Sequence, residues 1–163
     1  KLDGAEHRVT LLAANNYAST LVKLQRYQEA RSLLRKMIPV ARRVLGESKD
    51  LTLKMRWIYA RALYKDDSAT LDDLREAVAT LEETKRIARR VLGGAHPTTR
   101  GIELSLRESR AAFRTHEYWG PLFVCAFVSV VACVCQACSA RDAVLLTFIF
   151  MVAWLAYPRV INE

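Results

Sequence analysis

Cysteine and histidine are the residue types in this chain that could hold a metal ion. Cys133, Cys135 and Cys138 form a C-x-C-x-x-C pattern and supply three thiolates. A tetrahedral zinc site needs a fourth ligand, and His116 is separated from these cysteines by an apolar stretch. We therefore expect no metal and no cofactor. The cysteines would instead fill contacts between helices or, close to a membrane face, carry reversible acyl groups.

Acidic pairs are the other groups that could do chemistry, as general acids and bases. Asp72-Asp73 and Glu82-Glu83 fall on loop or exposed helical faces, where we expect solvated charges. The sequence has no Gly-rich phosphate loop and no nucleophile with a placed base. His7 and His96 lie in linkers, where a role at helix entry is favoured over catalysis. The sequence predicts a protein that is not an enzyme.

Charge is distributed very unevenly along the 163 residues. Lys and Arg total 25 against 17 Asp and Glu, which gives a net charge of +8. After residue 117 the charged residues are Arg141, Asp142, Arg159 and Glu163, whose charges sum to zero, and all four cysteines lie in this part. We therefore expect two domains, 1–117 and 118–163. The basic first domain favours acidic partners. The chain begins at Lys1, so we expect a fragment or a processed product.

An internal repeat organises the charged domain. The segment from Ala41 to Gly46 (ARRVLG) recurs 47 residues later, and Tyr17-Ala18 recurs 42 residues later as Tyr59-Ala60. The five-residue difference places an insertion within residues 66–70. Apolar spacing of the helical period predicts an all-α domain. Its expected helices cover 8–24, 27–45, 51–65, 70–92 and 97–116, and Pro39 should kink or split the second of them.

The linkers between these helices resemble those of a known repeat family. Residues 92–99 (LGGAHPTT) and their copy at 4–11 are similar to the linker of kinesin-light-chain-type tetratricopeptide repeats. The segments 15–18 (NNYA) and 26–30 (RYQEA) resemble that family's two helix signatures. The linker at 46–53 departs from the pattern. The resemblance implies antiparallel helix hairpins stacked into a right-handed solenoid, a short piece of a larger array. It also implies an inner groove, lined by first helices, that receives peptide segments of other proteins.

Helical geometry maps that groove onto this chain. If Ala18 and Ala60 pack against the partner helix, the neighbouring positions face the concave side. The candidate groove residues, with Val22, are Asn15, Ser19, Lys23, Lys54, Trp57, Arg61, Tyr64 and Lys65. They combine cationic ends, an asparagine that can pair with peptide backbone and an aromatic platform, and so predict an acidic, partly apolar peptide ligand. The alternative is that Trp57 and Tyr64 only pack between helices while the cations are solvated.

A different function would use repeated arginines at two helix ends. Arg42 and Arg43 recur as Arg89 and Arg90, which could form a basic ridge for nucleic acid or anionic lipid heads. Arginines at a helix C-terminus also offset its dipole. We favour this second interpretation and expect no nucleic-acid partner.

The second domain has the composition of a membrane segment. Residues 121–137 contain no charge, and residues 143–157 form a second apolar run. We expect a transmembrane helical hairpin that contacts lipid through residues 119–157. Arg107, Arg110, Arg114 and Arg159 then flank one side, so the repeat array would face the cytosol. Three alternatives stay open: one span with an interfacial helix, a hydrophobic cap on the open end of the array, and a tail created by an erroneous gene model. Without a true span we expect a cytoplasmic protein.

Overall fold

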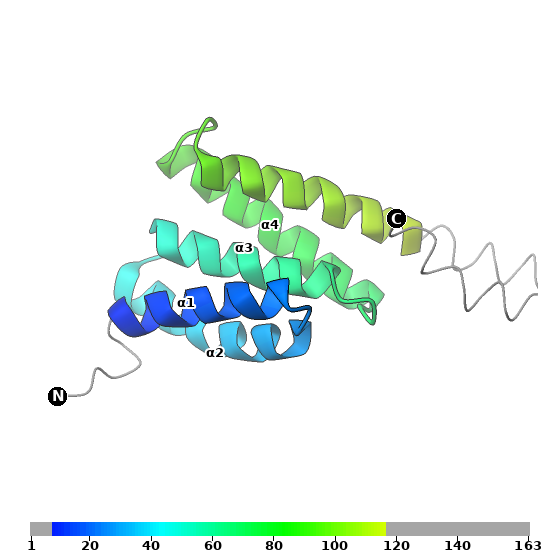
Figure 1. Cartoon of the computed structure of the whole chain (residues 1–163). Coiled ribbons are helices and arrows are strands. Elements are labelled where there is room, and N and C mark those ends of the chain that lie inside the picture. Colours follow the sequence, from blue (N-terminus) through cyan, green and yellow to red (C-terminus); the bar gives the residue numbers. More distant parts are fainter. Residues whose placement is uncertain (1–7, 117–163) are drawn as a thin grey trace, which may run out of the picture. The chain divides into compact units, whose positions relative to one another are not determined.

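The computed structural model describes residues 8–116, which are helical apart from short connections (Figure 1). The bounds of the first four helices are Arg8–Lys23 (α1), Tyr27–Leu45 (α2), Asp50–Tyr64 (α3) and Leu71–Val91 (α4). A fifth helix covers residues 97–116. No strand occurs in the described range. The all-α prediction is confirmed there, and each expected helix is present with ends shifted by at most one residue.

The helices stack as successive hairpins in chain order, from α1 and α2 to the fifth helix (Figure 1). Helix α1 packs against α2, α3 packs against α4, and α3 also contacts both α1 and α2. This arrangement follows from the short connections, which force neighbouring helices to run antiparallel. The two hairpins are therefore consistent with a tetratricopeptide-like helical repeat.

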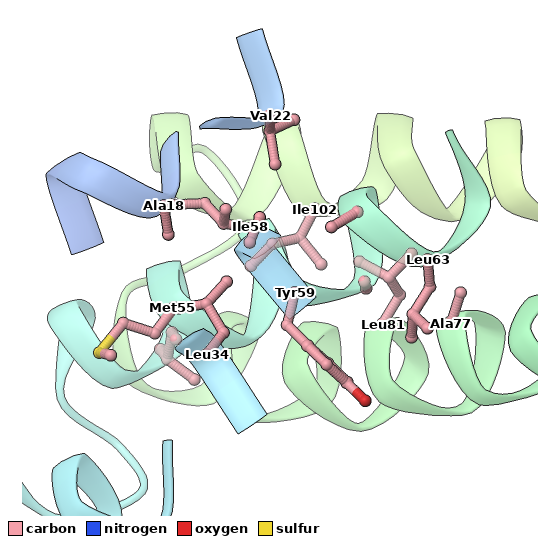
Figure 2. Packing of buried hydrophobic residues seen from close by; sticks show 14 of the residues in the cluster. Ala18, Val22, Leu34, Met55, Ile58, Tyr59, Leu63, Ala77, Leu81 and Ile102 are labelled. Atoms are coloured by element: carbon pink, nitrogen blue, oxygen red, sulfur yellow. The ribbon is translucent and has the colours of Figure 1, made fainter. Parts of the chain in front are cut away.

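The hydrophobic core repeats with the sequence. Leu11, Ala18 and Leu21 of α1 are at most 1% exposed, and so are Leu53, Ala60 and Leu63, which occupy the same positions of α3. In the second helices, Ala30, Leu34 and Ala41 are matched by Ala77, Leu81 and Ala88, all fully buried. Figure 2 shows Leu63 beside Leu81 and Ala77 of α4. Ala18 and Ala60 are both fully buried in the core, which meets the condition from which the candidate groove was mapped.

Local signals set the helix ends. Gly46 ends α2 and Gly93 follows α4, with φ of 94° and 84°, a left-handed conformation that favours glycine. Helix α4 begins with a capping box: the Thr70 side chain accepts a hydrogen bond from the Asp73 amide, and Asp73 accepts one of 3.1 Å from the Thr70 amide. The loop before Thr70 coincides with the predicted insertion, so the extra residues lengthen a connection and leave both helices intact.

The prediction that Pro39 could split α2 into two helices is wrong. Helix α2 continues from Tyr27 to Leu45 with Pro39 inside it. Proline removes the hydrogen bond that its amide would give to the carbonyl of Arg35. Both Pro39 and Arg35 are exposed, so water can reach that carbonyl and the helix tolerates the loss.

The predicted second domain lies outside the described residues, as do the transmembrane hairpin and the cysteine pattern. Contacts divide the chain into two units with their boundary between Arg114 and Thr115. Among the helices of residues 8–116, none combines the length and the apolar composition needed to cross a membrane.

Candidate functional site

The two layers of the helix stack differ in spacing. The Cα atoms of α1 and α3 approach within 8 Å, whereas those of α2 and α4 do not. Long side chains bridge α2 and α4 instead: Arg31 pairs with Asp73, and Arg35 Nη2 lies 4.0 Å from Glu76 Oε2. Because the first helices are closer together than the second helices, the surface of α1 and α3 is the inner side of the stack. The predicted groove residues belong to these two helices.

Helix α1 contributes four of the candidate residues, and they differ in accessibility. Val22 is buried in the core. Asn15 is only 8% exposed, and its Nδ2 donates to Asn16 Oδ1 over 3.3 Å. The Asn15 Oδ1 atom is buried and has no hydrogen-bond partner in the described part of the chain. Ser19 is partly buried, while Lys23 is exposed at the end of the helix. Lys23 is therefore the α1 candidate that a ligand reaches most directly.

The two aromatic candidates of α3 both contact the fifth helix. Trp57 Nε1 donates a hydrogen bond of 2.8 Å to Ser105 Oγ, and its ring lies against Gly101. The Tyr64 hydroxyl donates to Glu108 Oε2 over 2.6 Å. Burial, together with this hydrogen bond, raises the pKa of Tyr64 above its usual value. The structure thus places Trp57 and Tyr64 in the packing position that the sequence left open as the alternative to ligand contact.

The cationic candidates divide into paired and unpaired groups. Lys54 Nζ lies 2.6 Å from Asp50 Oδ2, and Lys65 Nζ lies 3.9 Å from Glu108 Oε2. The Arg61 guanidinium lies over the Trp57 ring, 5.9 Å from its centroid. Within residues 8–116, neither Arg61 nor Lys23 forms an ion pair. These two side chains carry the uncompensated charge of the candidate set.

Sequence reasoning missed the residues of the fifth helix that complete this region. Gly101, Ser105 and Glu108 receive the aromatic side chains of α3. A signal for one of them was present, since a lone glycine inside a helical pattern often marks close packing. Ser105 and Glu108 carried no such signal, because each is an ordinary polar residue at helical spacing.

The residues of the two acidic pairs form more ion pairs with arginines than the sequence predicted. Asp72 is a solvated charge that contacts Arg75 over 3.0 Å. Asp73 instead caps α4 and binds Arg31, and Glu83 pairs with Arg56, a buried residue. The expectation of a solvated charge is therefore wrong for Asp73, which is mostly buried against Arg31, whereas Glu83 is exposed as expected and also contacts Arg56. Residues 8–116 contain no cluster of three or more potential metal ligands.

The basic ridge, the interpretation that the sequence analysis did not favour, is partly neutralised by acidic neighbours. Arg42 pairs with Glu47, and Arg89 Nε lies 2.6 Å from Glu103 Oε1. At the following linker, His96 Nδ1 accepts a hydrogen bond of 3.2 Å from the Thr98 amide, which confirms its role at helix entry. His7 lies outside the described residues.

Comparison with protein families identifies one part of the stack. Residues 10–49 match the model of a family described as tetratricopeptide repeat. The match covers most of α1 and all of α2, and supports a protein of the tetratricopeptide-repeat type. Such repeats generally mediate protein–protein interaction and are typically non-enzymatic scaffolds. No curated protein and no solved structure matches the chain.

Proposed function

We propose that this chain is a protein-interaction scaffold that binds an acidic, partly apolar peptide segment along the inner side of α1 and α3. The observation that carries the proposal is the state of Arg61. On the outer layer, Arg31, Arg35, Arg42 and Arg89 all lie beside carboxylates. Arg61, on the inner side, rests on an indole ring and has no carboxylate partner within residues 8–116.

The chemistry of Arg61 suits recognition of a carboxylate. A guanidinium presents a planar fork of donors that matches two carboxylate oxygens, and the indole beneath it limits its freedom before a ligand arrives. Lys23 adds a second unpaired cation on α1. Binding of an acidic side chain at Arg61 would therefore need little reorganisation of the protein.

An apolar contact is available one helix further along. Leu104 of the fifth helix occupies the position that Trp57 has in α3, 47 residues earlier, and it is 57% exposed. A peptide that places an acidic residue at Arg61 can cover Leu104 with an apolar one. The ligand class is then an extended segment that combines both side-chain types.

We also propose which type of repeat array this chain forms and where in the cell it lies. The linker at residues 92–99 supports a repeat array of the kinesin-light-chain type. The apolar composition of residues 118–163 supports tethering to a membrane, with the array in the cytosol.

Binding to a peptide array, measured for the unmodified chain and for two charge-matched variants, tests the groove. The full chain is applied to an immobilised library of acidic–apolar peptides and to the same peptides with Lys in place of each acid. We expect selective binding to the acidic set, weakened about tenfold or more by Arg61→Glu. Arg42→Glu makes the same charge change on the outer layer and should leave binding intact. Equal loss in both variants, or no loss in Arg61→Glu, would contradict the groove.

A further inference from the structure

The fifth helix carries arginines where the preceding first helices carry buried apolar residues. Leu11 and Ala18 of α1, like Leu53 and Ala60 of α3, are fully buried. The same repeat positions in the fifth helix hold Arg100 and Arg107, and both are exposed. The next buried position of α3, Leu63, corresponds to Arg110, which pairs with Glu82 of α4, so the unpaired replacements are Arg100 and Arg107.

The face that these positions form is where a second helix packs in each of the first two repeats. Leu63, one turn beyond Ala60, lies beside Leu81 and Ala77 of α4 (Figure 2). Arg114, also exposed, follows Arg107 by seven residues, as Arg107 follows Arg100. Seven residues make nearly two helical turns, so these three side chains form one line about 21 Å long. We name Arg100, Arg107 and Arg114 the arginine stripe.

The charge of the arginine stripe is uncompensated in the described part of the chain. None of its three side chains forms an ion pair within residues 8–116. The acidic residues of the fifth helix face other neighbours: Glu103 binds Arg89 of α4, and Glu108 accepts from Tyr64 of α3. The stripe therefore presents three guanidinium groups to whatever lies beyond the fifth helix.

An apolar helix does not fit on this face as it does on α1 and α3. Such a helix would bury three guanidinium groups without partners, which carries a high free-energy cost. Phosphate groups are better partners, because a guanidinium can donate two parallel hydrogen bonds to phosphate oxygens. A straight line of three such groups suits a flat array of phosphates.

We propose that the arginine stripe binds the headgroups of an anionic lipid surface. Composition of the chain favours this source of phosphate: the weakly charged sequence from residue 118 onward begins four residues after Arg114. This choice of phosphate source rests on the proposed membrane tether of residues 118–163. The stripe does not include Arg61 or Lys23 of the peptide surface, but Leu104 lies between Arg100 and Arg107 on the same helix face, so a bound membrane would cover that one apolar contact.

Arginine footprinting on vesicles tests the proposal with the full chain. Phosphatidylcholine vesicles, with and without phosphatidylserine, are mixed with the protein, and modification of each arginine by phenylglyoxal is quantified by mass spectrometry. We expect protection of Arg100, Arg107 and Arg114 on the anionic vesicles alone. Arg86 and Arg90, exposed on α4, should stay reactive on both. Because each side chain is read separately, binding of the apolar sequence to both vesicle types does not mask the result.

A pair of charge-matched variants gives the second readout. The triple variant Arg100→Gln, Arg107→Gln, Arg114→Gln should lose a preference for anionic vesicles on the order of 100-fold. The control Lys36→Gln, Arg86→Gln, Arg90→Gln removes the same charge from exposed positions of α2 and α4 and should keep the preference. Raised salt should weaken the preference of the unmodified chain.

Several outcomes would overturn the proposal. Absence of binding to anionic vesicles, equal protection on neutral vesicles, or an unchanged preference in the stripe variant would each do so. Protection by a single-stranded RNA oligonucleotide but not by vesicles would assign the stripe to nucleic acid instead. Arg61→Glu keeps the stripe intact, so failure of the peptide surface and failure of the lipid surface can be told apart.

Discussion

The indole Nε1 of Trp57 donates a hydrogen bond of 2.8 Å to Oγ of Ser105, and this bond joins α3 to the helix that follows α4. Ser105 is 4% exposed, so the contact lies inside the stack. The Arg61 guanidinium lies over the indole ring. In the proposed groove, a peptide would therefore meet Arg61 before it meets the indole, and we expect Trp57 to act mainly by positioning Arg61 and the fifth helix.

Gly101→Ala tests how closely Trp57 packs on the fifth helix. A Cβ atom at residue 101 would lie 2.5 Å from Trp57 Cζ2, too close for either group to stay in place. Alanine favours a helix by about 1 kcal/mol over glycine, but overpacking costs about 1–3 kcal/mol. We expect Gly101→Ala to lower the free energy of unfolding in a urea titration of the full chain.

The smaller ring of Trp57→Phe provides the control for that experiment. In the Trp57→Phe background, Gly101→Ala should cost less, because the ring atoms that clash are absent. A stabilising effect of Gly101→Ala in the unmodified chain would show that the indole does not pack there.

Helical periodicity was sufficient to predict the core, because burial repeats with the sequence. Leu34 and Leu81 are both fully buried at matched positions. Periodicity failed where burial depends on a neighbouring hairpin. Tyr17 and Tyr59 occupy the same repeat position, yet Tyr17 is 55% exposed and Tyr59 only 6%. Helix α2 covers Tyr59, and no described helix covers Tyr17.

Polar contacts between helices could not be predicted from the sequence, for a related reason. The partners Trp57 and Ser105 are 48 residues apart, and Arg56 and Glu83 are 27 apart. Whether such pairs meet depends on the offset at which helices stack, and apolar spacing does not specify that offset. The candidate site was therefore predicted at the level of the helix face but not at the level of individual contacts.

Tyr59→Phe tests a hydrogen-bonded bridge across three helices. Arg35 Nη2 of α2 donates to the Tyr59 hydroxyl over 3.1 Å, and that hydroxyl donates to Glu76 Oε1 of α4 over 2.6 Å. Removing the hydroxyl breaks both bonds, so we expect a loss of about 1–2 kcal/mol in the free energy of unfolding. The matched change Tyr17→Phe, at the exposed equivalent, should cost less than about 0.5 kcal/mol. Equal effects would contradict a bridging role for Tyr59.

Asp73→Asn tests the cap of α4 through its pH dependence. Burial acts to raise the pKa of Asp73, but the hydrogen bonds from Thr70 and the charge of Arg31 together lower it below its usual value. The carboxylate therefore stabilises the fold above about pH 4, and this contribution is lost as pH falls through the lowered pKa. We expect Asp73→Asn to cost about 1 kcal/mol at neutral pH.

The difference between the Asp73→Asn variant and the unmodified chain should then shrink below about pH 4, where the unmodified carboxylate takes up a proton. Urea titrations across the acidic range measure it. Asp72→Asn serves as the control, because the Asp72 side chain is 89% exposed, and its effect should stay below about 0.5 kcal/mol. A constant difference for Asp73→Asn down to low pH would exclude the charged cap.

The pair formed by the buried Arg56 and the exposed Glu83 gives the sharpest contrast between two substitutions at one contact. Arg56 is 6% exposed and pairs with Glu83 through Nη2, while its Nη1 is buried without a partner in the described residues. Glu83→Gln leaves a buried cation without its counter-charge and should cost about 2 kcal/mol. Arg56→Met removes the cation, keeps most of the side-chain volume, and should be neutral or stabilising by about 1 kcal/mol. The double variant should recover most of the loss caused by Glu83→Gln, as urea titrations of the full chain would show. A larger loss from Arg56→Met than from Glu83→Gln would mean that the ion pair itself stabilises the second hairpin.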